Sequence, residues 1–464
     1  MKLHLVGWPK CWKPELVVLI VFSFATRLWS LFTPNAVVFD EVYFKAFAAH
    51  YFDGKYYFDI HPPLGKLLLA GWAHLIGLTS SQMLNGTAVG MRVLPATAGA
   101  LLIPLVWAIL RKLGASRPFA FLGAALLLLD NAVLVESRFI LMDSMLLLFG
   151  LTAIYLYLVA QSRHDRWRWL WLGLAALSAG AALSVKWTGL NALGIVLLLW
   201  AWDQRGRHVP WLRRLSEFAL LLAVPAVLYL SVFWIHFQLL PYSGTGDAFM
   251  STQFQSTLIG NSYYNPHTHL SFLDKFVELN VEMYHASATL TATHPYGSKW
   301  YSWPLEIRPI YYWEGSVLAN GSQGNIYLLG NPVVWWGIWI GILSGFAYMW
   351  QARRKLKPQT IGALAITGTA YLVNFLPFVG VTRVMFLYHY LFAFCYSLMF
   401  VVILWNDLAT SSDGRQLASN RHRQIFAAVI VIAALGFIYF APLSYGTPLS
   451  PQGLQDHMWL HSWR

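Results

Sequence analysis

Charged side chains are scarce in this sequence. Lys, Arg, Asp and Glu make up only 11% of its 464 residues, against about 25% in soluble domains. Hydrophobic residues make up 57%, and the mean hydropathy is +0.51. Such a chain cannot cover its surface with enough charge to stay dispersed in water, which excludes a soluble globular enzyme. The composition predicts an all-α polytopic membrane protein.

Cysteine is also rare, since only Cys11 and Cys395 are present. A disulfide-stapled fold and a multi-cysteine metal site are therefore excluded. Acidic residues and the 15 histidines could supply metal ligands, but no H-E-x-x-H or other metal-binding spacing occurs.

Long apolar runs recur along the chain. A helix that spans a bilayer needs about 20 mostly apolar residues, and about eleven runs are candidates. They divide the chain into an N-terminal membrane region at 1–236 with an external loop at 34–87, a large external loop at 237–331, and a C-terminal membrane region and external tail at 332–464. The runs lie near 15–33, 88–110, 119–135, 139–160, 168–185, 187–202, 216–236, 332–350, 360–379, 384–405 and 425–442.

Basic residues gather in alternate loops between these runs. The positive-inside rule places such loops in the cytoplasm. We therefore expect a multi-pass cell-membrane protein with its N-terminus inside and, given an odd number of spans, its long loops and C-terminus outside. The net charge of +12 then reflects topology and not nucleic-acid binding. These loops hold 20 of the 32 basic residues: Lys2, Lys10, Lys13, Arg111, Lys112, Arg117, Arg163, Arg166, Arg168, Arg205, Arg207, Arg213, Arg214, Arg353, Arg354, Lys355, Lys357, Arg415, Arg421 and Arg423.

The loop at 34–87 has the pattern of a segment that folds back onto the membrane. Apolar residues recur at helical spacing between 44 and 51, which predicts an amphipathic interfacial helix with Gly54 as its C-terminal stop. His61, Pro62 and Pro63 then force an extended segment. Pro63 can begin a second helix at 64–76, whose apolar run is too short to span. We expect interfacial helices in the large loop as well.

Two adjacent acids, Asp40 and Glu41, follow the point where the first span leaves the membrane. Carboxylates in a partly dry site are costly unless they are paired or used in function. One alternative is that either acid caps the interfacial helix at its N-terminus. The presence of His61 and Lys66 in the same loop favours a functional site.

Five blocks of sequence closely resemble the motifs of the protein O-mannosyltransferases, which take mannose from a polyprenyl-phosphate lipid. They occur in the family's order over nearly the whole chain. The first block is VFDEVYF at 38–44 with DIHPPLGK at 59–66, and the others are ESRFILMD at 136–143, SVKWTG at 184–189, HPYGSKWYSWP at 294–304 and RVMFLYHY at 383–390.

The resemblance implies a C-type glycosyltransferase architecture and transfer of mannose to Ser or Thr hydroxyls of secreted or membrane proteins, with no metal or cofactor. It places Asp40 as the catalytic base and Glu41 as its essential neighbour, which Arg138 could position. It also implies a single inverting displacement. Eukaryotic members carry a β-trefoil MIR domain in the large loop, and roughly 95 residues leave no room for one, so the chain resembles a bacterial member.

Three cations, Arg138, Lys186 and Arg383, lie at short external turns between apolar runs, at the depth of lipid phosphates. They can pair with the donor phosphate, the arginines bidentately. Snorkelling to phospholipid head groups, or pairing of Arg138 with Glu41, is the alternative. We also expect His61 to contact the donor.

The block at 294–304 supplies the expected acceptor or sugar contacts, which are His294, Ser298, Lys299 and Trp300. Its aromatic residues could form a surface for an acceptor peptide or for mannose. Anchoring of this loop at the bilayer interface is the alternative.

Two other functions compete with this interpretation. One is a related transferase with another sugar or acceptor, such as aminoarabinose and lipid A, although the blocks at 59–66 and 294–304 favour the mannosyltransferases. The other is a transporter, but the apolar runs hold almost no charge beyond Arg27 and Arg92, and no internal repeat occurs. The acceptor proteins and the oligomeric state stay open.

The predicted topology can be tested by cysteine labelling on a background without Cys11 and Cys395. We expect an impermeant thiol reagent to label Asn265→Cys from outside, and to label Ser412→Cys only after permeabilisation, because basic residues flank the second position. Equal labelling of both in intact cells would show that the predicted orientation is wrong.

Overall fold

The computed structural model describes residues 13–163, 165–205, 210–353, 355–410 and 419–464. Seven residues named above lie outside these ranges, namely Lys2, Lys10, Cys11, Arg207, Arg354, Ser412 and Arg415.

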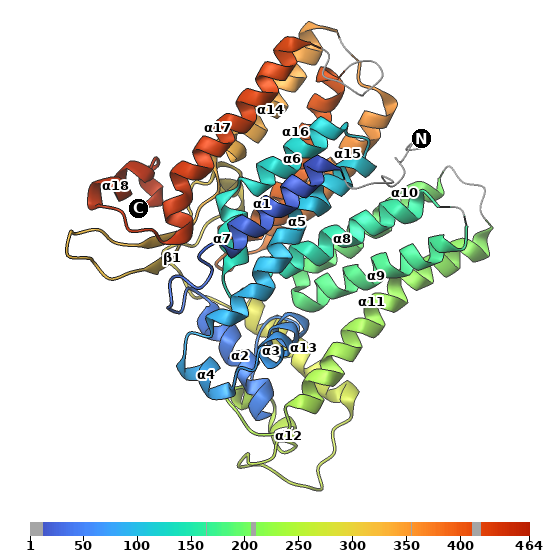
Figure 1. Cartoon of the computed structure of the whole chain (residues 1–464). Helices are drawn as coiled ribbons and strands as arrows, with labels where there is room; N and C mark the ends of the chain where they lie inside the picture. Colours follow the sequence, from blue (N-terminus) through green and yellow to red (C-terminus); the bar gives the residue numbers. More distant parts are fainter. Residues whose placement is uncertain (1–12, 164, 206–209, 354, 411–418) are drawn as a thin grey trace.

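Long apolar helices form the body of the protein and pack side by side (Figure 1). In the part of the chain that the structure describes, eight spanning candidates are long and apolar enough to cross a membrane. Each candidate consists mainly of one α-helix. These helices are α5 (Val93–Lys112), α8 (Asp143–Gln161), α9 (Trp167–Val185), α11 (Trp211–Leu239), α14 (Pro332–Gln351), α15 (Pro358–Phe375), α16 (Leu391–Ala409) and α17 (Asn420–Tyr445).

The expected number of eleven spans is not confirmed. A ninth span arises if α6 (Arg117–Leu128) and α7 (Asn131–Arg138), which meet at a bend of 58°, are taken together. The remaining two apolar runs form α1 (Pro14–Leu28) and α10 (Leu190–Gln204), each of 15 residues. At 1.5 Å per residue such a helix reaches about 22 Å, less than the hydrocarbon thickness of about 30 Å.

The first long loop folds into the two predicted helices. These are α2 (Glu41–Asp53) and α3 (Leu64–Leu75), and they are followed by α4 (Ser80–Asn85) and η1 (Val89–Arg92). Gly54 ends α2 with φ = 67°, a left-handed conformation that favours glycine. Pro63 caps α3 at its N-terminus and is not its first residue. Both helices lie at one end of the bundle (Figure 1).

The large loop contains short helices and, contrary to the all-α prediction, two strands. Its helical elements are η3 (Asp247–Phe249), α12 (Thr252–Gln255), α13 (Phe272–Ala288) and η4 (Trp300–Leu305). The strands β1 (Ile310–Glu314) and β2 (Asn325–Leu328) form an antiparallel pair with an irregularity between Tyr311 and Trp313.

Short elements lie at one end of the C-terminal helices. The segments η5 (Leu376–Gly380) and η6 (Leu387–Tyr390) connect α15 to α16. The tail forms α18 (Pro451–His457) and η7 (His461–Trp463), where the buried Trp463 indole donates to the carbonyl oxygen of Glu306. The tail therefore packs against the large loop.

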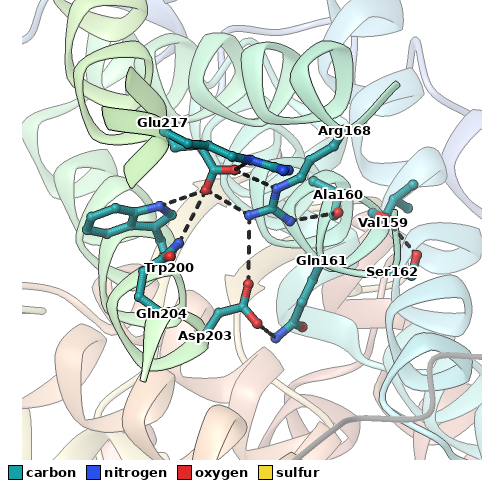
Figure 2. A network of polar contacts seen from close by, with 10 residues as sticks. Val159, Ala160, Gln161, Ser162, Arg168, Trp200, Asp203, Gln204 and Glu217 are labelled. Carbon is teal, nitrogen blue, oxygen red and sulfur yellow. Dashed lines mark hydrogen bonds and ion pairs between the residues drawn. The ribbon is translucent and has the colours of Figure 1, made fainter. Parts of the chain in front are cut away.

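A buried polar network links the four helices α8, α9, α10 and α11 at the end of the bundle opposite to α2 and α3 (Figures 1 and 2). The Arg168 guanidinium forks onto the Glu217 carboxylate, with Nε to Oε1 at 2.7 Å and Nη2 to Oε2 at 2.9 Å. Arg168 also donates to the carbonyl of Ala160, and the side chains of Trp200 and Gln204 donate to Glu217. Because a buried charge is costly without partners, these contacts fix the four helices relative to one another.

We expect Glu217→Ala to lower the free energy of unfolding by about 3–5 kcal/mol, because it leaves the Arg168 charge buried without its main partner. Denaturant titration in detergent micelles would measure this loss. The matched control is Glu15→Ala, which removes the partner of the partly exposed Arg117 and should cost only about 0–1 kcal/mol. Equal losses in the two variants would show that the Arg168 network does not hold the bundle together.

Candidate active site

A cavity of about 330 Å³ lies where the first long loop meets the adjoining ends of the helices, and we name it the polar cavity after its charged side chains. Residues from α8, η2 (Trp187–Gly189), α10, α13, α15 and η6 contribute to its wall. Its polar and charged lining residues are Asp40, Tyr43, Asp59, His61, Asp143, Lys186, Thr188, Asn191, Ser287, Asn374, Arg383, Tyr388 and His389.

Asp40 immediately precedes α2, but its side chain makes no capping hydrogen bond. The capping alternative is therefore excluded for Asp40, whose carboxyl group lines the cavity. Burial raises the pKa of Asp40 to about 6, against the opposing effect of Lys186, and Asp143 and Asp59 add to the increase. A carboxylate with a raised pKa binds a proton more readily, as a general base must.

Glu41 is fully buried and does not line the cavity. Its carboxylate accepts two hydrogen bonds from the Arg92 guanidinium, at 2.7 and 2.8 Å, and two more from the backbone N–H groups of Val38 and Ile140. The structure thus gives Glu41 an orienting role with Arg92, and not Arg138, as its partner. The sequence feature that could have indicated a special role for Arg92 is its position inside an apolar run, where charged residues are rare.

Arg138 is buried and does not line the polar cavity. Its guanidinium donates to the carbonyl oxygens of Arg27, Trp29 and Ser30 at 3.0, 2.6 and 2.9 Å. These carbonyls lie in the last turn of α1 and just after it, where helix geometry leaves acceptors unpaired. The expected contact of Arg138 with a donor phosphate therefore does not fit its position, and it closes the end of α1 instead.

Lys186 and Arg383 do line the cavity, as expected for cations that bind an anion. Lys186 Nζ lies 2.5 Å from Asp143 Oδ2 and 5.2 Å from the ring centroid of Tyr388. Arg383 is half-buried, and among the described residues no carboxylate pairs with it. Its guanidinium is thus available to an anionic ligand.

His61 and Asp59 bring the extended segment before α3 to the cavity. Lys66 ties this segment down, because its ammonium lies 2.5 Å from Asp59 Oδ2 and donates to the carbonyl of His61 at 2.6 Å. Burial lowers the pKa of His61 to about 3, so its imidazole is neutral at physiological pH. His61 can therefore contact an anion only as a hydrogen-bond donor. Burial would raise the pKa of Asp59, but Lys66 and His61 hold it below its usual value.

A second cavity of about 560 Å³ adjoins the first and shares Leu290, Arg383 and Val384 with it. Three of the four expected acceptor contacts, His294, Ser298 and Lys299, line this cavity. Trp300 lines neither cavity and packs with its ring edge-on to Phe375, at a centroid distance of 5.2 Å.

Several cavity residues were not among the predicted site residues. Asp59, Asp143, Tyr388 and His389 lie inside the sequence blocks that resemble the family's motifs. Their place in these blocks is the sequence feature that could have identified them as site residues. Asn191 and Asn374 are polar residues in apolar helices, and their amide groups lie 3.3 Å apart. The expectations that no metal and no cofactor are required stay predictions.

Comparison with solved structures identifies the class of fold. The chain is similar to the S. cerevisiae protein O-mannosyltransferase Pmt1-Pmt2 complex bound to the sugar donor, with a TM-score of 0.86 and 22% identity over 97% of this chain and 92% of that chain. It also resembles ArnT from Cupriavidus metallidurans, with a TM-score of 0.55 and 16% identity over 93% of this chain and 76% of that chain. The fold is that of polytopic membrane glycosyltransferases.

Sequence comparison identifies the family. Residues 17–241 match the model of dolichyl-phosphate-mannose-protein mannosyltransferase, and residues 272–463 match the C-terminal four TMM region of protein-O-mannosyltransferase. The chain belongs to the protein O-mannosyltransferase family.

Two curated relatives illustrate the extent of the likeness. Protein O-mannosyltransferase 1 of Drosophila melanogaster is 33% identical over 68% of this chain and 37% of its own length. Dolichyl-phosphate-mannose--protein mannosyltransferase 4 of Schizosaccharomyces pombe is 33% identical over 71% of this chain and 43% of its own length. The matched region therefore covers less than half of these relatives.

The position of Arg138 predicts the effect of Arg138→Lys. A lysine ammonium cannot reach all three carbonyls at the end of α1, so we expect the free energy of unfolding to fall by about 1–3 kcal/mol. Thermal unfolding and the KM for a lipid-phosphate donor would be measured together, and the KM should not change. A raised KM with unchanged stability would show that Arg138 contacts the donor and that its role at the end of α1 is wrongly assigned.

Proposed function

We propose that this protein transfers mannose from a polyprenyl-phosphate-mannose lipid to Ser or Thr hydroxyls of proteins at the external face of the membrane. Membership of the mannosyltransferase family supports this assignment, as does its similarity to relatives named as protein mannosyltransferases. The proposed orientation has the N-terminus in the cytoplasm and the two long loops outside, supported by the basic residues in alternate loops. The polar cavity then faces the external leaflet.

One observation carries the proposed mechanism. Three carboxylates line the polar cavity, and two of them are ion-paired, Asp59 with Lys66 and Asp143 with Lys186. Within the described residues Asp40 makes no ion pair. An ion pair stabilises the charged form and weakens a carboxylate as a base, so Asp40 is best placed to accept the hydroxyl proton.

The proposed reaction is a single displacement. The hydroxyl oxygen attacks the anomeric carbon as its proton passes to Asp40, and the bond from that carbon to the phosphate oxygen breaks with inversion. Lys186 and Arg383 would stabilise the departing phosphate, which leaves with its own charge and needs no general acid. In this role a cation acts most strongly in the transition state, where negative charge accumulates on the phosphate.

The second cavity would hold the acceptor. It lies next to the polar cavity, so a polypeptide segment in contact with His294, Ser298 and Lys299 can place a hydroxyl near Asp40. Arg383 belongs to both cavities and would lie between the two substrates.

Replacement of Asp40 by asparagine tests this assignment. Asp40→Asn keeps the shape of the side chain and loses the proton acceptor, so single-turnover transfer at saturating substrates should slow by about 10²- to 10⁴-fold. Asp53→Asn is the matched control, because Asp53 lies in the last turn of α2 and not in the cavity. Transfer of radiolabelled mannose to a threonine peptide would be measured, with an aminoarabinose lipid as the competing donor.

The pH dependence of the same reaction provides a second readout. A base whose pKa is about 6 is protonated below that pH, so the wild-type and Asp53→Asn rates should fall as the pH drops through about 6. The residual Asp40→Asn rate should lack this decline. An Asp40→Asn rate above about a tenth of wild type would move the base to another residue, and transfer from the aminoarabinose donor alone would overturn the substrate assignment.

A further inference from the structure

The residue that precedes Asp40 has an unusual backbone conformation. Phe39 has φ = 48°, in the left-handed region that bulky residues other than glycine rarely adopt. Such a conformation persists only where the surroundings hold it. The peptide group between Phe39 and Asp40 sets the direction in which the Asp40 side chain leaves the backbone, so whatever holds Phe39 also aims Asp40.

Tyr312 makes the contacts that hold Phe39. The two rings are stacked, with centroids 4.2 Å apart and planes at 7°, and the Phe39 N–H donates to the Tyr312 carbonyl oxygen at 3.2 Å. Tyr312 lies in β1 of the large loop, and its side chain is buried. Its hydroxyl donates to Glu136 Oε2 at 2.6 Å, which fixes the ring from its far end.

The ion pair of Glu41 and Arg92 does not replace this contact. Glu41 accepts hydrogen bonds from the N–H groups of Val38 and Ile140. It therefore fixes the backbone before Phe39 and the segment between α7 and α8. The ring of Phe39 is stacked on Tyr312 alone among the described aromatic residues. Without that stack the backbone at Phe39 can relax to a negative φ, and the peptide group before Asp40 rotates.

We infer that Tyr312 is a positioning residue for the transfer reaction: by stacking on Phe39 it keeps the strained turn that points the Asp40 carboxylate into the cavity. The β1–β2 hairpin of the large loop thus supports the base in the first loop. This inference rests on the proposed function, in which Asp40 is the base.

The test compares Tyr312→Leu, Phe39→Leu and the double variant. Each single variant should lower kcat by about 10- to 100-fold, as expected for a misplaced reacting group, while the KM values for donor and acceptor stay unchanged. The double variant should be no slower than the singles, because both remove one contact. Tyr312→Phe keeps the stack and loses only the hydrogen bond to Glu136, so it should lose less activity than Tyr312→Leu.

The matched control is Tyr311→Leu. Tyr311 precedes Tyr312 in β1, but its ring packs on Tyr327, with centroids 4.6 Å apart. It should therefore leave kcat near the wild-type value. Equal losses of kcat in Tyr311→Leu and Tyr312→Leu, fully additive losses in the double variant, or an effect on KM alone would overturn the inference.

A readout without catalysis separates this inference from the proposed function. On a chain with Cys11→Ser and Cys395→Ser, the rate at which a small thiol reagent labels Asp40→Cys reports the direction of the side chain. Tyr312→Leu should change that rate and Tyr311→Leu should not. If the wild-type protein transfers no mannose, the proposed function fails, whereas an unchanged labelling rate in Tyr312→Leu overturns the positioning role whatever the reaction is. Failure of Tyr312→Leu to fold leaves Phe39→Leu to decide by the same labelling.

Discussion

The buried ion pair of Glu41 and Arg92 is the constraint on which the end of the protein that holds the polar cavity depends. Both side chains are 0% exposed, and a charge in such a place is tolerated only with a partner and further hydrogen bonds. Arg92 meets this requirement by donating also to the carbonyls of Leu31, Pro34 and Ala36. Glu41 also accepts from the N–H group of Ile140, between α7 and α8. One ion pair thus joins three separate segments and fixes the backbone on either side of the turn that carries Asp40.

The same electrostatic rule separates the roles of the acids around the cavity. Asp59 and Asp143 each pair with a lysine at 2.5 Å. These ion pairs hold the side chains of Lys66 and Lys186 in place. Asp40 is partly buried without such a partner, and desolvation therefore raises its pKa. The adjacent acids Asp40 and Glu41 differ in role because one faces the cavity and the other faces an arginine.

The sequence predicted features that depend on local pattern. The long apolar runs are helical, although the run at 119–135 is divided between α6 and α7, and the helices α2 and α3 lie where helical spacing, Gly54 and the prolines predicted them. It could not predict which charges pair, because Arg92 and Glu41 are 51 positions apart and meet only through the tertiary fold. The hydrogen bonds of Arg138 could not be predicted for the same reason, since the carbonyls to which it donates come from the end of α1. The number of spans was uncertain because α1 and α10 are shorter than a bilayer requires.

The contact of Phe39 with Tyr312 shows how the two long loops depend on each other. The first loop carries Asp40, the proposed base, and its strained turn is in contact with a strand from the large loop. The large loop also supplies His294, Ser298 and Lys299 to the adjoining cavity. In the proposed reaction the loop that receives the acceptor therefore also positions the base. Movement of the large loop would displace the acceptor and misdirect Asp40 together, so binding of the acceptor and orientation of the base are coupled by one piece of structure.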